Sequence, residues 1–158
     1  MLKKISVMEV FFVWYYMNMN KPSIQQLTQA LHSSWGADTC FNSNKWTEDN
    51  AARGQCTVSS LVVQDYFGGE LLRYQVNEGD LNEKHYCNIL DDGTIIDTTG
   101  SQYKNPVNLR VKPVDLVGKF TSVRNRCLSD EDTRQRYELL KSRVVLALNN
   151  TKTDGNIL

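Results

Sequence analysis

Apolar positions spaced by three and four residues predict a helix at each end of the region that begins at residue 21. In KPSIQQLTQALHSSW, residues 21–35, Leu27 and Leu31 fall on one face of a helix. In SDEDTRQRYELLKSRVVLALNN, residues 129–150, the same spacing returns, with Ser129 placed to cap the first turn. Each helix has one apolar stripe, so we expect both to pack against a shared core.

Between these helices, the pattern predicts one further helix and an antiparallel meander. The helix begins near Cys56 in RGQCTVSSLVVQDYF and is ended by the two glycines at 68–69. Residues 70–76, 84–90 and 94–99 have the composition of strands and are separated by the turn sequences NEGD and DDG.

Two stretches have no hydrophobic period. Residues 36–53 are rich in Asn, Asp, Ser and Thr, and loops of this length in compact domains usually carry function. Within residues 101–128, only 107–111 favours a short edge strand. The order of elements predicts an α+β fold, in which a helix with cysteine at its N-terminus packs on the meander between an N-terminal and a C-terminal helix.

The two ends of the chain lie outside this pattern. Residues 1–20 hold an apolar run from Ile5 to Met17, interrupted by Glu9, which is shorter than the roughly 20 residues that span a bilayer and lacks a signal-peptide cleavage site. They form an extra strand or helix, an extension upstream of a later start, or a segment that lies against a partner or membrane surface. We therefore expect an extension at 1–20, one domain at 21–149 and a disordered tail at 150–158.

Composition narrows the function classes. The 158 residues include 18 basic and 18 acidic side chains, so a broad basic face for nucleic acid is not expected, and neither is firm membrane association. The four cysteines, which have neither paired metal-ligand spacing nor the density of a secreted disulfide framework, indicate reduced thiols in the cytoplasm; they are Cys40, Cys56, Cys87 and Cys127. We expect no metal and no cofactor.

Cys56 is the residue around which chemistry can be built. Buried cysteine is often only a small hydrophobe, but a helix N-terminus presents free N–H groups and partial positive charge that favour a thiolate. A nucleophile also needs a base, for which His85 on the second strand is the candidate, and the base needs an orienting acceptor, for which Asp97 is the candidate.

The turn between the second and third strands decides whether this triad can form. A two-residue type I′ turn at Asp92-Gly93 would place His85 and Asp97 on opposite faces of the sheet. A type I turn with Gly93 in the left-handed bulge position would instead set Leu90 opposite Thr94 and put Asp97 diagonally beside His85. Under the first register, Asn88 replaces Asp97 as the orienting residue.

An acyl-transfer site also needs donors for the oxyanion. The backbone N–H of Cys56 is one candidate, and the side chains of Gln55, Trp46 and Asn50 are candidates for the second. Gln55 alternatively supports the turn before the helix. Cys87 lies on the His85 face within a strand, where packing is its expected role.

Several of these motifs together resemble the YunG-like family of small uncharacterised bacterial proteins. The matching residues are Gly54-Gln55-Cys56, VQDYFGGELLR at 63–73, His85-Tyr86, Asn88, Leu90, Asp92-Gly93, Asp97, Thr99 and TRQRYELL at 133–140. Arg53 before GQC and Cys87 after His85-Tyr86 depart from the pattern, which has aromatic residues there. The order of cysteine, histidine and aspartate is distantly similar to the papain and transglutaminase-like architecture, and this resemblance implies that fold.

The first hypothesis is a cysteine-dependent acyl-transfer enzyme, acting as a hydrolase, deamidase or transglutaminase on a peptide, protein or small amide. The alternative is a non-catalytic papain-like module that binds a peptide or protein through residues 36–53. A third is redox sensing by Cys56 with Cys87 as the resolving thiol.

Overall fold

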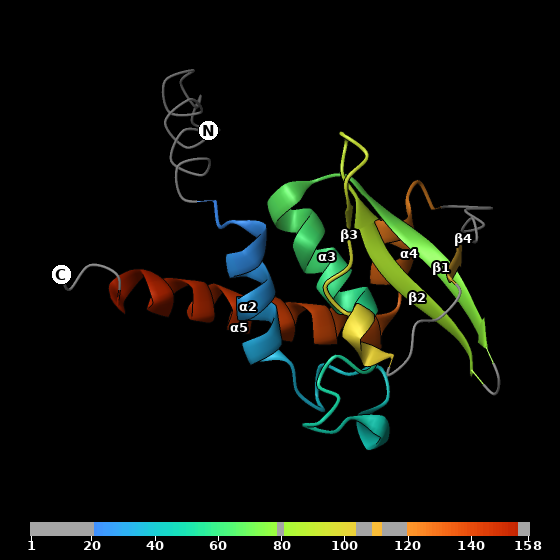
Figure 1. Cartoon of the computed structure of the whole chain (residues 1–158), viewed down its shortest axis with the longest axis horizontal. Coiled ribbons are helices and arrows are strands. Elements are labelled where there is room, and N and C mark those ends of the chain that lie inside the picture. Colours follow the sequence, from blue (N-terminus) through green and yellow to red (C-terminus); the bar gives the residue numbers. More distant parts are fainter. Residues whose placement is uncertain (1–20, 79–80, 104–108, 112–119, 155–158) are drawn as a thin grey trace, which may run out of the picture.

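A computed structural model of the chain describes residues 21–78, 81–103, 109–111 and 120–154 (Figure 1). Helices α2 (Ile24–Ser34), α3 (Cys56–Phe67), α4 (Val123–Leu128) and α5 (Glu131–Asp154) accompany strands β1 (Glu70–Glu78), β2 (Leu81–Ile89), β3 (Ile95–Ile96) and β4 (Leu109–Val111). Two short 3₁₀ turns, η1 (Ser43–Lys45) and η2 (Gly100–Gln102), complete the described elements. The expected extension at residues 1–20 lies outside the described residues.

Within the described ranges the strands form one antiparallel sheet in the order β3-β2-β1-β4. The α+β class and the antiparallel meander expected from sequence are therefore confirmed. β2 pairs with a neighbour along both edges, whereas β3 and β4 are the outer strands. All of β2 pairs with β1, whereas its pairing with β3 covers Asn88 and Ile89.

Local sequence explains where the helices begin and end. α2 starts with a capping box, in which Gln26 N donates to Ser23 Oγ at 3.1 Å and Ser23 N donates to Gln26 Oε1 at 2.8 Å. α3 ends as predicted at Gly68, whose φ of 73° requires a glycine.

The following residue, Gly69, lies where the backbone of β2 leaves no space for a side chain. Gly69 has a φ of 71°, and a Cβ built there would lie 2.2 Å from the Ile89 carbonyl oxygen at the end of β2. The close approach lets the chain turn directly from α3 into β1, so the cysteine helix packs beside the strands that follow it.

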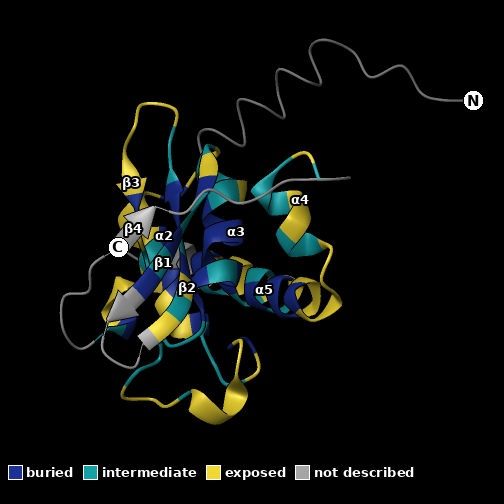
Figure 2. Ribbon diagram, turned by 90° about the vertical axis from the view of Figure 1, so that its right-hand side faces the viewer, coloured by how far each residue is buried: buried dark blue, intermediate teal, exposed yellow. Residues whose placement is uncertain are grey.

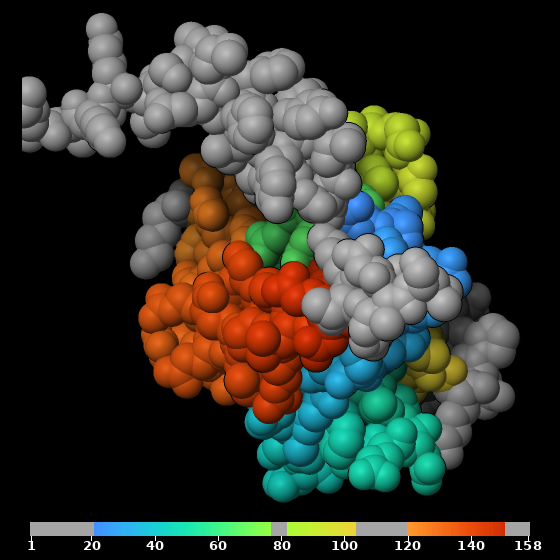
Figure 3. All heavy atoms as spheres, turned by 90° about the vertical axis from the view of Figure 1, so that its left-hand side faces the viewer, coloured from blue at the N-terminus to red at the C-terminus, as the bar shows by residue number. Residues whose placement is uncertain are grey.

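The core lies between the sheet and the helices, with α3 at its centre (Figure 2). Figure 3 shows α2 and α5 side by side on one face, with the polar loop at 36–53 below them. Both helices contribute the predicted apolar stripes, and the fully buried members of the core are Leu27, Leu31, Val58, Leu61, Val62, Val63, Leu140 and Val144.

Several element boundaries differ from the predictions, including those of β1 and β2, which were expected at 70–76 and 84–90. Ser129 is the C-cap of α4, a helix that the sequence pattern did not predict, and Asp130 caps α5 by accepting from Thr133 N at 2.8 Å. An aspartate next to a serine offers an equally good acceptor, and the packing of α4 decides between them. The helix α5 runs to Asp154, so it includes residues 150–154 of the segment expected as tail.

The strand expected at 94–99 is shorter. β3 covers only Ile95–Ile96, because the Asp97 side chain accepts a hydrogen bond from Thr99 N at 3.0 Å and turns the chain locally. Of the edge strand expected at 107–111, β4 covers Leu109–Val111, and residues 104–108 lie outside the described part. No helix in the described part of the chain is both long and apolar enough to cross a bilayer.

Candidate active site

Cys56 is the first residue of α3, as the sequence predicted, and the loop before it is shaped by Gly54. Gly54 has a φ of 68°, and a Cβ there would lie 2.6 Å from Cys40 Sγ. Its carbonyl accepts a hydrogen bond from Phe41 N at 2.9 Å, so the two ends of the polar loop close against each other just before the cysteine. Cys56 itself is 8% exposed.

His85 and Asp97 meet in the structure. His85 Nε2 lies 2.7 Å from Asp97 Oδ2, and the histidine is fully buried on the interior strand β2. Of the two turns that the sequence left open, the structure has the bulged form: Leu90 N donates to Thr94 O at 2.8 Å and Gly93 has a φ of 84°. The register of the two strands, with Asn88 opposite Ile96, is the one that places Asp97 diagonally beside His85.

The charges around His85 favour its protonated form. Burial by itself lowers the pKa of His85, but hydrogen bonds with Asp97 and then with the Cys56 thiol raise it to about 9. Burial likewise raises the pKa of Asp97, and the contact with His85 outweighs it, so that this pKa lies below its ordinary value. The pair is therefore a charge-assisted contact, with Cys56 as the further partner of the ring.

The sequence pattern did not identify Gln102, which lies in η2 and is 5% exposed. Its Nε2 lies 2.9 Å from His85 Nδ1 and 3.2 Å from the Thr99 carbonyl oxygen. No hydrophobic period marks this part of the chain, so only the folded position of η2 beside β2 reveals the contact.

Tyr103 follows directly and packs its ring edge-on against His85, with ring centroids 5.5 Å apart. Burial, then the charges of Glu83 and Cys56, raise the pKa of Tyr103. Its hydroxyl is buried and makes no hydrogen bond of normal geometry within the described part of the chain. Arg53 and Glu83 form a bidentate ion pair, in which the two guanidinium NH₂ groups donate to the two carboxylate oxygens at 2.8 and 2.7 Å. Together with Tyr103, this ion pair makes the neighbourhood of His85 polar.

The side chains proposed as oxyanion donors all make hydrogen bonds elsewhere. Gln55 Nε2 donates to Gly36 O at 2.9 Å, and Trp46 Nε1 donates to Ala51 O at 3.1 Å. Asn50 Nδ2 donates to Gln102 O at 3.0 Å, so it joins the polar loop to η2.

The alternative orienting residue, Asn88, is also occupied. Its Nδ2 donates to Ser60 O of α3 at 2.9 Å and not to His85. This bond ties the middle of the cysteine helix to β2, and the side chain is 1% exposed. Its observed contact is with the backbone of the helix, whereas Asp97 is the carboxylate that contacts His85.

The other thiols differ from Cys56 in their surroundings. Burial raises the pKa of Cys40, and it raises the pKa of both Cys87 and Cys127 to about 11. The thiolate, which is the reactive form, is therefore scarce at these three positions near neutral pH. Cys87 also shares a hydrogen bond with Tyr74 on the neighbouring strand.

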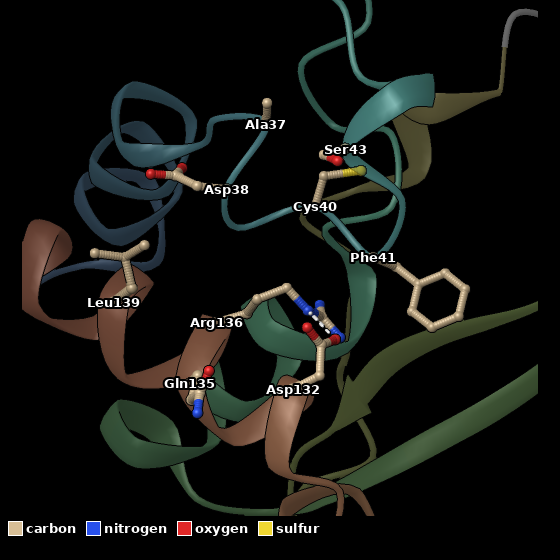
Figure 4. Close-up of a pocket in the computed structure, with 9 residues that line it drawn as sticks. All are labelled: Ala37, Asp38, Cys40, Phe41, Ser43, Asp132, Gln135, Arg136 and Leu139. Atoms are coloured by element: carbon tan, nitrogen blue, oxygen red, sulfur yellow. Dashed lines mark hydrogen bonds and ion pairs between the residues drawn. The ribbon is translucent and has the colours of Figure 1, made fainter.

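A separate cavity of about 350 Å³ lies between the polar loop and α5 (Figure 4). Arg136 extends into it and is paired with Asp132 at 2.7 Å. No triad residue lines this cavity, whose walls are Ala37, Asp38, Cys40, Phe41, Ser43, Asp132, Gln135, Arg136 and Leu139. Within the described residues, no group of three or more His, Cys, Asp and Glu side chains is arranged to hold a metal ion.

Comparisons with known proteins agree with the sequence motifs. The model of the family described as YunG protein matches residues 23–149. The protein of Bacillus subtilis (strain 168) named "Uncharacterized protein YunG" is 32% identical over 90 residues, which cover 57% of this chain and 71% of that protein. No solved structure matches the chain. The extent of the family match and the identity to this relative place the chain in the YunG protein family.

Proposed function

We propose that this protein is a cysteine-dependent acyl-transfer enzyme with Cys56 as nucleophile, His85 as base and Asp97 as the residue that orients the base. The observation that carries the proposal is the 2.7 Å contact between His85 Nε2 and Asp97 Oδ2, in a ring that also contacts the Cys56 thiol. A nucleophile, a base and an orienting acceptor in contact are the arrangement that acyl transfer requires.

The proposed reaction begins when the Cys56 sulfur attacks the carbonyl carbon of an amide. The thiol proton passes to His85 Nδ1, and the negative charge that develops on the oxygen meets the Cys56 N–H, one of the N–H groups that the first turn of α3 leaves without an intrahelical partner. The C–N bond then breaks, the amine leaves with the proton from His85, and a thioester remains. Water or an amine, deprotonated by His85, releases the acyl group and restores the thiol.

The architecture that we propose for this site is papain/transglutaminase-like. A helix that opens with the nucleophile, followed by antiparallel strands that carry the base and the orienting carboxylate, supports this assignment. Such folds host hydrolysis, deamidation and transfer, and the nature of the acceptor decides among them. The proposed substrate class is therefore a peptide, a protein or a small amide.

Alkylation with iodoacetamide at a series of pH values, with each cysteine followed by mass spectrometry, tests the proposed nucleophile. We expect Cys56 to react well below the pH of about 8.5 at which a free thiol ionises, and to react at least about tenfold faster than the other three cysteines. Raised pKa values should keep Cys40, Cys87 and Cys127 slow, so that they serve as internal references.

Two histidine variants complete the experiment. His85→Gln, designed to retain a hydrogen bond to Asp97, should abolish the alkylation of Cys56 well below a pH of about 8.5. His32→Ala, at the only other histidine, which is exposed at the end of α2, should leave it unchanged. The proposal would be contradicted by equal alkylation rates at all four cysteines in the folded protein. It would also be contradicted if His85→Gln left the alkylation of Cys56 at low pH unchanged.

One observation favours the non-catalytic alternative, a binding module that uses the polar loop. Cys56 is 8% exposed and His85 is fully buried, whereas Phe41 on the rim of the loop cavity is 77% exposed. Phe41 thus adds an accessible apolar surface to the polar lining of this cavity, where a bound peptide or protein would make contact. A Cys56 that stays inert to iodoacetamide while the protein is folded would support this alternative.

A further inference from the structure

His85 Nδ1 lies 2.9 Å from the Gln102 amide nitrogen, and the Cys56 thiol is a further hydrogen-bond partner of the same ring. A neutral imidazole that carries its proton on Nε2 has a single lone pair at Nδ1, which accepts one hydrogen bond. With Nε2 held against Asp97, this is the tautomer that the contacts favour. Since Asp97 occupies Nε2, Nδ1 is the ring nitrogen left to accept the Cys56 proton, and Gln102 donates to its lone pair.

The orientation of the Gln102 amide is set from outside the triad. Its Nε2 lies 3.2 Å from the Thr99 carbonyl oxygen, which only accepts hydrogen bonds, so the NH₂ end must point this way. Turning the amide by half a rotation would place its own oxygen against that carbonyl. The segment that carries it is also anchored, because Asn50 Nδ2 donates to Gln102 O at 3.0 Å.

This fixed donor matters when His85 takes up a proton. A protonated Nδ1 would place its hydrogen against the NH₂ of Gln102, and the hydrogen bond at 2.9 Å would be lost. The uncharged ring keeps the bond. Gln102 thus opposes Asp97 and Cys56, both of which favour the charged ring.

We propose that Gln102 is a positioning residue for His85: its fixed NH₂ group opposes the protonation that Asp97 and Cys56 favour and, in the uncharged ring, keeps Nδ1 free of hydrogen so that it can accept the Cys56 proton. The role rests on the proposed function, since a prepared base has a use only if Cys56 reacts. Other ionisable groups near His85 also influence its pKa, so the effect of Gln102 is measured with all of them in place. Those that face His85 or its immediate partners are Cys56 on α3, Asp97 after β3, Tyr103 after η2, Tyr74 opposite on β1, and Cys87 and Glu83 on β2.

Nitrogen NMR of the two histidine rings tests this role directly. The titration should be recorded in a Cys56→Ala background, so that ionisation of the thiol does not couple to that of the ring. Gln102→Met removes the donor at similar volume, and Gln102→Glu replaces it with an acceptor. We expect the pKa of His85 to rise by about one unit in the Met variant, the size expected for one lost hydrogen bond, and further in the Glu variant. His32, which is exposed at the end of α2 and contacts the Thr98 carbonyl oxygen at 3.3 Å rather than Gln102, is the control in every spectrum and should not move.

The wild-type protein supplies a second measurement that does not depend on the folding of any variant. Above the pKa of His85, its spectrum should show hydrogen on Nε2 and an acceptor at Nδ1. Hydrogen on Nδ1, or a pKa of His85 that is equal with Gln, Met and Glu at position 102, would overturn the proposal. The result is separate from that of alkylation: an inert Cys56 refutes the enzyme, whereas the titration reports on Gln102 in either case.

Discussion

At the scale of single residues, His85 combines complete burial with three polar neighbours. A buried cation is costly unless it is paired, and Asp97 provides the pairing through a contact of 2.7 Å. The carboxylate therefore stabilises the positive charge that His85 gains when it accepts the thiol proton. The same contact links protein stability to pH.

The linkage predicts how Asp97→Asn changes stability with pH. The pKa of His85 is about 9 in the folded protein and 6.5 for an ordinary histidine, so its protonation stabilises the fold fully below pH 6.5, and this contribution is lost as the pH rises through about 9. The full contribution is about 3 kcal/mol, of which Asp97 supplies the largest favourable part. We expect the wild-type advantage in free energy of unfolding over Asp97→Asn to shrink across this window.

Urea unfolding at several pH values measures this advantage. Asp92→Asn, an exposed carboxylate in the preceding turn, is the matched control and should give a difference that stays flat over the same window. A flat difference for Asp97→Asn as well would mean that the carboxylate does not stabilise a charged His85.

At the scale of elements, two glycines determine how α3 and the strands after it are positioned relative to one another. Gly69 turns the chain from the helix into β1 against the end of β2, and Gly93 forms the bulge that sets the register between β2 and β3. The first position leaves no room for a side chain, whereas a Cβ at the second would have nothing within 4 Å. These two glycines therefore separate the effect of crowding from that of backbone conformation.

Gly69→Ala should cost far more stability than Gly93→Ala. Both residues have positive φ, for which an alanine costs about 1–2 kcal/mol, but only the Cβ at Gly69 would collide with a backbone oxygen, at 2.2 Å. We expect Gly69→Ala to be worse by at least about 2 kcal/mol, measured as the difference in free energy of unfolding in urea. Similar losses for the two variants would show that the backbone at Gly69 moves aside.

The element-scale features divide into those that sequence predicts and those that it does not. The DDG sequence predicts a turn and limits it to two forms, of which the bulged one brings His85 and Asp97 together, and the folded register distinguishes the two. Gln102 and α4 could not be predicted, because neither lies in a periodic pattern and each depends on packing against distant segments. The prediction of Ser129 as the cap of α5 was wrong for the same reason, because Ser129 ends the unpredicted α4 and Asp130 caps α5.

At the scale of the whole molecule, α5 closes the core over α2 and α3. Its buried face contributes Tyr137, Leu140 and Val144, and its tyrosine hydroxyl joins a polar cluster in which Arg124 of α4 and Asp65 of α3 take part. Three helices are thus linked by one set of contacts on the side of α3 away from the triad. Stability of the site should therefore depend on a helix that contributes none of the triad residues.

Leu140→Ala tests this dependence. The side chain is fully buried, so its truncation should cost about 2–5 kcal/mol in free energy of unfolding. Leu146→Ala on the same helix is the matched control, because Leu146 is 64% exposed and its loss should change stability by less than about 0.5 kcal/mol. Equal effects on the midpoint of urea unfolding would exclude α5 as part of the main core.

The shape of the sheet has a consequence for how such a site changes over evolution. His85 lies on an inner strand, whereas Asp97 directly follows β3, an edge strand of only two residues. Mutations in the turn that precedes β3 can therefore reposition the carboxylate while the histidine and the cysteine keep their places. In relatives of this chain, substitutions in this short turn can therefore change the basicity of the histidine, at little cost to the rest of the fold.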